Sequence, residues 1–227
     1  MSRPPRDGGQ APTLADGARR IAPIGIAAAG FGISFGILAG SAGMPLPATV
    51  VMSATTFAGS AQFAAASVLA DAGPVAVAIV TAVLLNLRYL PIGLSAAPAF
   101  EGGALRRLVE AQLVVDESWA LAHVGGGRYD RRLIIGGGLV LYAAWVGGTA
   151  VGALGAGWLG DPGRLGLDAA FPALFLALLW GQGIGRDRRA LAAALLGLGL
   201  ALALVPFTPP GVPLAAAALA SLIGWRR

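Results

Sequence analysis

The chain of 227 residues has no cysteine, no lysine and one histidine, and only 12% of its residues are charged. The lack of cysteine excludes disulfide bonds, thiolate metal sites and cysteine nucleophiles. A soluble domain usually has about 25% charged residues, so the low charge excludes a large soluble enzyme and indicates lipid as the main solvent. The wealth of Ala, Gly, Pro and Arg is typical of a GC-rich bacterial genome.

Hydrophobic residues dominate the sequence: they make up 56% of the chain, and the mean hydropathy is +0.75. A hydrocarbon core of about 30 Å needs about 20 apolar residues for each crossing, so the chain is predicted to be an all-α, polytopic membrane helical bundle of about 7 to 8 spans. The apolar stretches are 21–42, 46–70, 74–100, 108–124, 133–159, 169–185, 190–206 and 212–225. The weakest predictions are 108–124, which contains three carboxylates, and the short last stretch.

The arginines lie between apolar stretches, which indicates membrane topology rather than nucleic-acid binding. Residues 1–20 are expected to form a disordered basic tail, and residues 21–227 a membrane transport domain. With eight crossings and a cytoplasmic N-terminus, twelve arginines lie at inside ends and three at outside ends. If 108–124 does not cross, the best split is ten against five. This favours a multi-pass protein of the bacterial inner membrane with both ends in the cytoplasm.

Two glycine patterns suggest an internal repeat with an offset of about 116 residues. Glycines spaced by four, Gly32, Gly36 and Gly40, recur as Gly148, Gly152 and Ala156. Later landmarks follow the same offset closely: Pro45 with Pro162, Phe57 with Phe171, and Pro91 with Pro206. The pattern favours a duplicated three-span unit, with repeats over 21–100 and 133–225. One crossing between the halves would make the repeats parallel, and none would make them inverted.

Small residues four apart let another helix approach closely, so the first three glycines are expected to serve helix packing. In the next stretch, the segment TTFAGSAQFAAAS places Gly59, Ser60 and Gln62 at membrane depth. Glutamine is costly there without a partner, and glycine loosens a helix. A helix broken near the midplane is how many transporters hold a zwitterionic substrate. Interhelical hydrogen bonding, worth about 0.6 to 2 kcal/mol per contact, explains the same residues equally well.

The third stretch contains LLNLRYLPIGLSAAP. An arginine at the centre of a span costs about 2.5 to 3.5 kcal/mol, so Arg88 needs a partner or a water-filled cavity. Pro91 removes a backbone hydrogen bond and Gly93 adds flexibility, so the helix is expected to break just after Arg88. A substrate carboxylate would suit Arg88 or an exposed helix end, and Gln62, Asn86 or Asp116 would suit the substrate ammonium group. A structural pair between Arg88 and a carboxylate side chain is the alternative.

Asp116 and Glu117 are adjacent in LVVDESWALAHV and point about 100° apart on a helix. A buried carboxylate with a raised pKa is the usual proton-coupling group, so both are candidates for proton coupling or for an ion pair with Arg88. The alternative places this helix end in the aqueous interface. His123 is expected to be interfacial and solvated. No residue pattern indicates a metal or a cofactor.

Four segments carry a family resemblance in this order: FAGSAQF (57–63), NLRYLPIGLSAAP (86–98), DESWAL (116–121) and FPALFLALL (171–179). Together they resemble the AzlC family of bacterial branched-chain amino acid permeases, which includes the large subunit of a valine exporter. The resemblance implies an inner-membrane secondary transporter, often an exporter, with no enzymatic activity. It also implies a small membrane partner of the AzlD type. Tyr89 stands where the family often has a histidine, so no proton role is carried over to that position.

Two other classes remain open. An intramembrane scaffold subunit without its own pathway would have no reason to keep Arg88 inside an apolar stretch. An intramembrane serine protease would pair Ser41 or Ser60 with His123, but the histidine lies close to a membrane end. A transporter of branched-chain amino acids is therefore the main prediction. Its substrate-binding candidates are Gly59, Ser60, Gln62, Asn86 and Arg88.

Overall fold

A computed structural model describes residues 11–156, 176, 188–208 and 212–220 of the chain. Within these ranges the chain forms helices and no strand, which confirms the all-α class. The backbone divides into two compact units. The first unit takes its residues from Met1–Ile26 and Tyr89–Ala143, and the second from Ala27–Arg88 and Ala144–Arg227.

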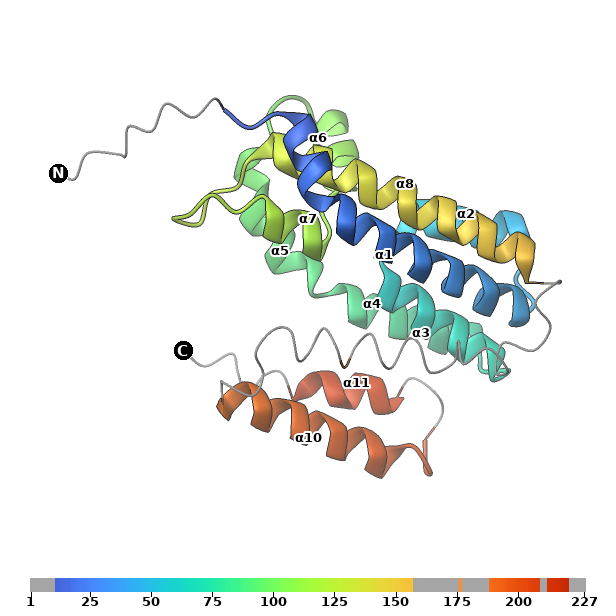
Figure 1. Ribbon diagram of the computed structural model, residues 1–227. Coiled ribbons are helices and arrows are strands. Elements are labelled where there is room, and N and C mark those ends of the chain that lie inside the picture. Colours follow the sequence, from blue (N-terminus) through green and yellow to red (C-terminus); the bar gives the residue numbers. More distant parts are fainter. Residues whose placement is uncertain (1–10, 157–175, 177–187, 209–211, 221–227) are drawn as a thin grey trace. The chain divides into compact units, whose positions relative to one another are not determined.

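Two long helices, α1 (Leu14–Ser41) and α8 (Arg131–Gly155), start in the first unit and end in the second (Figure 1). Both are long and apolar enough to cross a membrane. The pair of α4 (Val75–Asn86) and α5 (Tyr89–Ala96) becomes a third span if its 41° bend lies within one crossing. The described residues thus contain two or three apolar spans. Apart from residue 176, the expected crossing at 169–185 falls outside them.

The first helix begins at Leu14, earlier than the Ile21 that the sequence suggests, so part of the expected tail is helical. The reason is a cap formed by Thr13 and Asp16. The Asp16 carboxylate accepts a hydrogen bond from the Thr13 N–H at 2.8 Å, and the Asp16 N–H donates to Thr13 Oγ1 at 3.2 Å. These bonds satisfy backbone groups that would otherwise lack partners at the helix start. Residues 1–10 of the tail lie outside the described ranges.

α1 and α8 are parallel neighbours that approach each other through small residues (Figure 1). A Cβ on Gly32 would meet the backbone of Trp145 and Thr149, and a Cβ on Gly40 would meet the side chain of Ala156. The partners in α8 advance along the chain as the residues in α1 do, so the two helices run in the same direction. Five glycines of α1 face α8 in this way: Gly17, Gly25, Gly32, Gly36 and Gly40.

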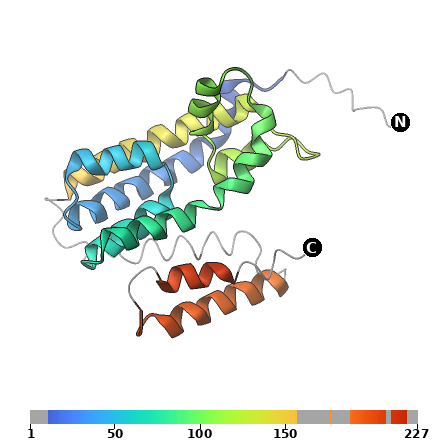
Figure 2. The same cartoon turned by 180° about the vertical axis from the view of Figure 1, so that it is seen from behind.

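The second apolar stretch, 46–70, reverses direction halfway within the second unit. Its length suggests a single crossing instead. α2 (Leu46–Thr56) starts beside the end of α1, and the chain reverses before α3 (Gly59–Ala70), as Figure 2 shows. The loop at 71–74 is again at the end of the unit where α1 finishes. α3 and α4 pack side by side as an antiparallel hairpin. Helices of 11 and 12 residues are each about half of what a crossing needs.

Short helices complete the first unit: a 3₁₀ turn, η1 (Ala97–Ala99), then α6 (Ala104–Ala111) and α7 (Asp116–Leu121). α6 and α7 occupy the stretch 108–124, where a fourth crossing was the weakest prediction. With eight and six residues, neither helix is long enough to cross. The Trp119 Nε1–H donates to Ser95 Oγ at 2.9 Å and ties α7 to α5. The core of this region contains Ala96, Phe100, Ala122, Leu133 and Ile134.

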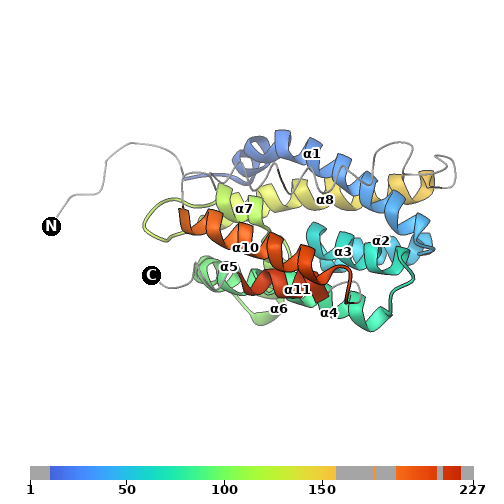
Figure 3. The same ribbon diagram turned by 90° about the horizontal axis from the view of Figure 1, so that it is seen from below.

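α10 (Arg188–Leu204) and α11 (Val212–Leu219) lie side by side as a second helical hairpin, which Figures 1 and 3 show. They correspond to the expected stretches 190–206 and 212–225, the last of which is described only as far as residue 220. The repeat landmarks Pro162 and Phe171 lie outside the described residues, so the duplicated unit stays a prediction.

Large apolar side chains cover the outer faces of several helices. Ile26, Val51, Ile79, Leu94 and Val151 are all exposed. Water would penalise such a surface, whereas hydrocarbon accepts it and requires only that the backbone be hydrogen-bonded within its helices. These faces are therefore suited to contact with lipid.

Candidate functional site

The candidate site lies at the break between α2 and α3, in the second unit. Phe57 has a φ of 42°, in the left-handed region, and Ala58 is extended, so the chain reverses at these two residues. A left-handed residue other than glycine costs about 1 to 2 kcal/mol, which surrounding contacts must offset. A Cβ on Gly59 would come within 2.8 Å of the Trp145 ring. A residue larger than glycine would therefore have to push the Trp145 ring away from the start of α3.

Gln62, in the first turn of α3, holds the break in its conformation. Its side chain is fully buried, and its Oε1 accepts hydrogen bonds from the Ala58 N–H at 3.2 Å and the Trp145 Nε1–H at 3.0 Å. Because both partners can only donate, the amide oxygen must face them, and this fixes the orientation of the amide. The amide nitrogen of Gln62 keeps two N–H groups to donate.

Three buried side-chain atoms in the described ranges have no hydrogen-bond partner: Ser60 Oγ, Gln62 Nε2 and Asn86 Oδ1. All three belong to the second unit and to residues that the sequence marks as substrate-binding candidates. A buried polar group without a partner costs about 1 to 3 kcal/mol, so folded proteins retain few of them. A ligand or an ordered water that supplied these bonds would recover that cost.

The α3–α4 hairpin places two of these atoms at the same level. Ser60 lies ten residues before the end of α3, and Asn86 lies eleven residues after the start of α4. At about 1.5 Å per residue, both are about 15 Å from the connecting loop, half the thickness of a hydrocarbon core. The start of α3 is the positive end of its helix dipole, and the end of α4 is the negative end of its own. Opposite partial charges therefore lie at one level of the hairpin.

Aromatic and hydroxyl contacts join the break to α1 and α8. The rings of Phe35, Phe63 and Trp145 are buried, with centroids 5.6 to 6.3 Å apart. The hydroxyls of Ser53 and Thr149 are 2.8 Å apart, and Thr149 also donates to the Trp145 carbonyl. Edge-on and stacked aromatic pairs each add about 0.5 to 1.5 kcal/mol beyond the area they bury. The break is thus fixed from several sides.

Trp145 and Thr149 were not predicted from the sequence, although a signal for them exists. Trp145, Gly148, Thr149 and Gly152 are spaced by three and four residues, so they share one helical face with the glycines that approach α1. A polar residue on a close-packed face at membrane depth is expected to meet a polar partner.

Arg88 lies in the two-residue break between α4 and α5 and is exposed. Asp116 and Glu117 are in the first turn of α7, in the first unit, whereas Arg88 belongs to the second. Asp116 is half-buried and Glu117 is exposed. A helix start favours carboxylates through its dipole. His123 is exposed after α7, with its ring centroid 5.4 Å from that of Tyr129.

A second polar cluster, around Glu110 in α6, was not foreseen from the sequence. Glu110 is buried and accepts hydrogen bonds from Arg131 Nε at 2.7 Å, from a second nitrogen of Arg131, and from Arg106 Nε at 2.8 Å. The hydrogen bonds from Arg131 lower the pKa of Glu110 to about 2, against the opposing effect of burial. The i, i+4 spacing of Arg106 and Glu110 was the signal available. A carboxylate held ionised in this way is suited to structure rather than to proton transfer.

No group of three or more His, Cys, Asp or Glu side chains within the described ranges could hold a metal ion. Ser41 donates to the Ile37 carbonyl at 2.9 Å within α1. Ser60 belongs to the second unit and His123 to the first.

Comparisons with known proteins agree with the resemblance seen in the sequence. The chain is 29% identical to the branched-chain amino acid transport protein AzlC of Bacillus subtilis, over 76% of this chain and 68% of that protein. It is 27% identical to the inner membrane protein YgaZ of Escherichia coli, over 82% and 79% of the two chains. It is 32% identical to an uncharacterized membrane protein of Archaeoglobus fulgidus, over 89% and 90%. No solved structure matches the chain significantly.

A family model described as AzlC protein matches residues 23–159. The match covers more than half of the chain and contains most of α1, the α2–α3 break, the α3–α4 hairpin and α8. The chain therefore belongs to the AzlC family.

Proposed function

We propose that the chain is a secondary transporter of branched-chain amino acids and that the α2–α3 break is its substrate-binding site. Membership of the AzlC family and likeness to a branched-chain amino acid transport protein support the transport role. The observation that carries the site is the set of three buried polar atoms without partners, on Ser60, Gln62 and Asn86.

The backbone end of an α-amino acid complements these atoms. Its carboxylate would accept hydrogen bonds from the Gln62 amide nitrogen, the Ser60 hydroxyl and the first-turn amides of α3, which have no carbonyl of their own helix to bond. Its ammonium would donate to Asn86 Oδ1 at the negative end of α4. Hydrogen bonds to charged groups contribute about 1.5 to 3 kcal/mol each, enough to repay the burial of these atoms.

The remaining parts of the substrate and pathway are assigned to neighbouring residues. Phe57 and Phe63 are buried beside the break and offer an apolar surface to an aliphatic side chain. Arg88 lies in the α4–α5 break, where its charge would attract the substrate carboxylate on its way to the site. Asp116 and Glu117 are the first carboxylates to examine for proton coupling.

We further propose that the chain works in the bacterial inner membrane, with its N-terminus in the cytoplasm. The positive-inside rule supports this orientation. Export, and assembly with a small AzlD-type membrane subunit, rest on the family resemblance.

Transport of radiolabelled leucine into everted vesicles, with the AzlD-type subunit coexpressed, tests the site. Gln62→Glu is the sharpest variant, because it keeps an oxygen for the Ala58 and Trp145 donors and replaces the two free N–H groups with a second oxygen. We expect Gln62→Glu and Ser60→Ala each to lower kcat/KM on the order of tenfold or more.

Ser34→Ala is the matched control for Ser60→Ala, because the Ser34 hydroxyl already donates to the Gly30 carbonyl of its own helix at 3.1 Å. Ser34→Ala is expected to transport like the wild type. If Gln62→Glu and Ser60→Ala also do so, the assigned site is wrong. If the partner subunit alone transports leucine, and substitutions at the assigned site of this chain do not alter transport, the chain is a scaffold instead.

A further inference from the structure

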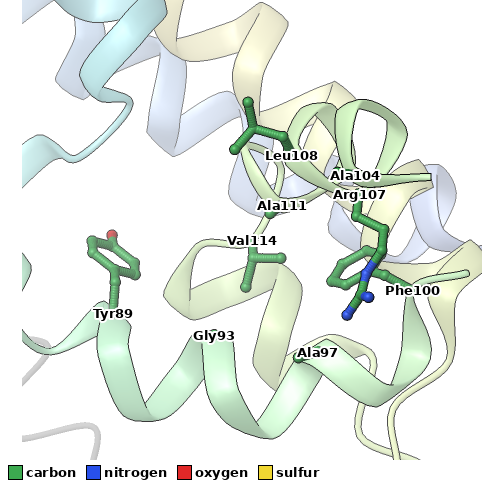
Figure 4. A pocket seen from close by; sticks show the side chains of 9 residues that line it. All are labelled: Tyr89, Gly93, Ala97, Phe100, Ala104, Arg107, Leu108, Ala111 and Val114. Atoms are coloured by element: carbon green, nitrogen blue, oxygen red, sulfur yellow. The ribbon is translucent and has the colours of Figure 1, made fainter. Parts of the chain in front are cut away.

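A pocket of about 500 Å³ lies in the first unit, between α5 with η1 on one side and α6 with the following segment on the other. Figure 4 shows Tyr89 at one end and Arg107 at the other, with apolar side chains between them. The apolar lining includes Gly93, Ala97, Phe100 and Val114. The pocket is therefore an apolar trough with one strong positive charge at its end.

The helix that carries Arg107 has an inverted pattern of burial. In α6 the acidic residue Glu110 is 8% exposed, whereas Leu105, Leu108 and Val109 are 76%, 71% and 62% exposed. A helix on the surface of a soluble protein buries its leucines and exposes its charges. An outward apolar face beside arginines is typical of a helix that lies in the interface of a membrane.

The two adjacent arginines of α6 differ in their partners. Arg106 is paired with Glu110 at 2.8 Å, so its charge is neutralised. Arg107 has no ion pair within the described ranges, and its guanidinium faces the pocket in Figure 4. A guanidinium presents its N–H groups in a planar fork that fits two oxygens of a phosphate. The charged end of the trough therefore suits a phosphate group.

We propose that this pocket binds an anionic phospholipid, with the phosphate on Arg107 and an acyl chain along the apolar lining. A free anion would use the arginine alone and leave the trough empty, whereas a phospholipid satisfies both parts. Leu108 lines the pocket and is 71% exposed, so it extends the apolar surface out of the pocket, as lipid packing requires.

The experiment uses the full chain purified in a neutral detergent and titrated with phosphatidylglycerol or phosphatidylcholine, with bound lipid counted by native mass spectrometry. Arg107→Gln removes the charge at the pocket. Arg128→Gln is the matched control, because Arg128 is exposed in the loop after α7 and does not line the pocket. Gly93→Leu fills the trough and keeps every charge, since a Cβ on Gly93 meets no atom within 4 Å.

We expect phosphatidylglycerol to bind more tightly than phosphatidylcholine, and Arg107→Gln to weaken its binding about fivefold, as about 1 kcal/mol per basic residue implies. Gly93→Leu should weaken binding of both lipids, while Arg128→Gln should leave it unchanged. If inorganic phosphate competes with phosphatidylglycerol and Gly93→Leu does not weaken binding, the ligand is a free anion instead. Equal effects of Arg107→Gln and Arg128→Gln, or no effect of either, would overturn the proposal.

Discussion

At the scale of single residues, the direction of one amide determines what the site can bind. The Trp145 indole and the Ala58 backbone can only donate, so the Gln62 oxygen is committed to them and the nitrogen is left over. The two N–H groups of the Gln62 amide are therefore free to donate hydrogen bonds to a ligand. A substrate carboxylate is the group that such donors bind most strongly.

The residues whose buried polar atoms lack a hydrogen-bond partner could be predicted from the sequence, but their geometry could not. Ser60, Gln62 and Asn86 stand out because polar side chains are costly within apolar stretches. What orients Gln62 is Trp145, which is 83 positions away along the chain. Periodicity relates residues within one helix and carries no information on a contact at that separation.

The ionised state of Glu110 leads to a prediction about pH. Its pKa is lowered to about 2 from an ordinary 4.5, so the folded chain holds the carboxylate ionised where an unfolded chain would bind a proton. The stabilisation from its pairs with Arg131 and Arg106 is therefore complete above about pH 4.5, and it is lost as the pH falls toward 2. Differential scanning fluorimetry in detergent should show this as a difference in Tm between wild type and Glu110→Gln.

That difference in Tm should be constant from pH 7 to about 5 and should shrink as the pH is lowered from there. Glu110→Gln is the appropriate comparison because it keeps the size of the side chain and titrates nowhere in this range. A difference that stayed constant down to pH 3 would show that the ion pairs contribute nothing to stability.

At the scale of helices, the glycines of α1 allow α8 to pack closely against it. A Cβ on Gly36 would meet the backbone of Thr149 and Ala153, whereas a Cβ on Gly30 would meet no atom within 4 Å. Gly36→Ala should therefore force the helices apart, at a cost of about 1 to 3 kcal/mol and a Tm lowered by roughly 2 to 10 °C. Gly30→Ala, on the same helix, should leave the Tm unchanged or raise it slightly, because alanine favours helix.

Thermal unfolding of the two purified variants in one detergent is a direct comparison. Equal losses for Gly36→Ala and Gly30→Ala would mean that the glycines act through helix flexibility and not through contact with α8.

The helices themselves were easier to predict than their paths. Apolar length located α1 and α8 well, because long uninterrupted helices have one way to bury their backbone in lipid. The stretch 46–70 has the length of a span but reverses at Phe57 and Ala58, and nothing in its apolar content distinguishes the two outcomes. The reversal depends on Gln62 and Trp145, which are brought together only by tertiary packing.

This reversal also changes how the two halves relate. The sequence alone makes the repeats parallel only if the stretch between them crosses once. With 46–70 turning back, α1 and α8 run parallel although 108–124 forms helices too short to cross. The parallel packing of the two glycine-rich helices supports a parallel arrangement for the proposed duplicated unit.

At the scale of the whole molecule, the same reversal changes which arginines are expected on each side of the membrane. Arg106 and Arg107 were expected outside. If the N-terminus is cytoplasmic and α4 with α5 makes one crossing, the reversal of 46–70 puts them inside, together with the arginines near residue 130. Up to residue 132, apart from Arg88 in its break, inside ends then hold nine arginines and outside ends none. The connections at 42–45 and 71–74 contain no basic residue, and the second contains Asp71. This distribution satisfies the positive-inside rule better than eight crossings do.

Cysteine accessibility tests this topology, and the chain is suited to it because it has no native cysteine. Asp71→Cys and Arg128→Cys place single thiols at two exposed positions. If all eight apolar stretches crossed the membrane, residues 71 and 128 would both be cytoplasmic and would react from the same side. Because the stretch turns back, we expect a membrane-impermeant maleimide to label Asp71→Cys in intact spheroplasts and Arg128→Cys only in everted vesicles. Labelling of both from one side would contradict the reversal, and with it the placement of the α2–α3 break at mid-membrane depth.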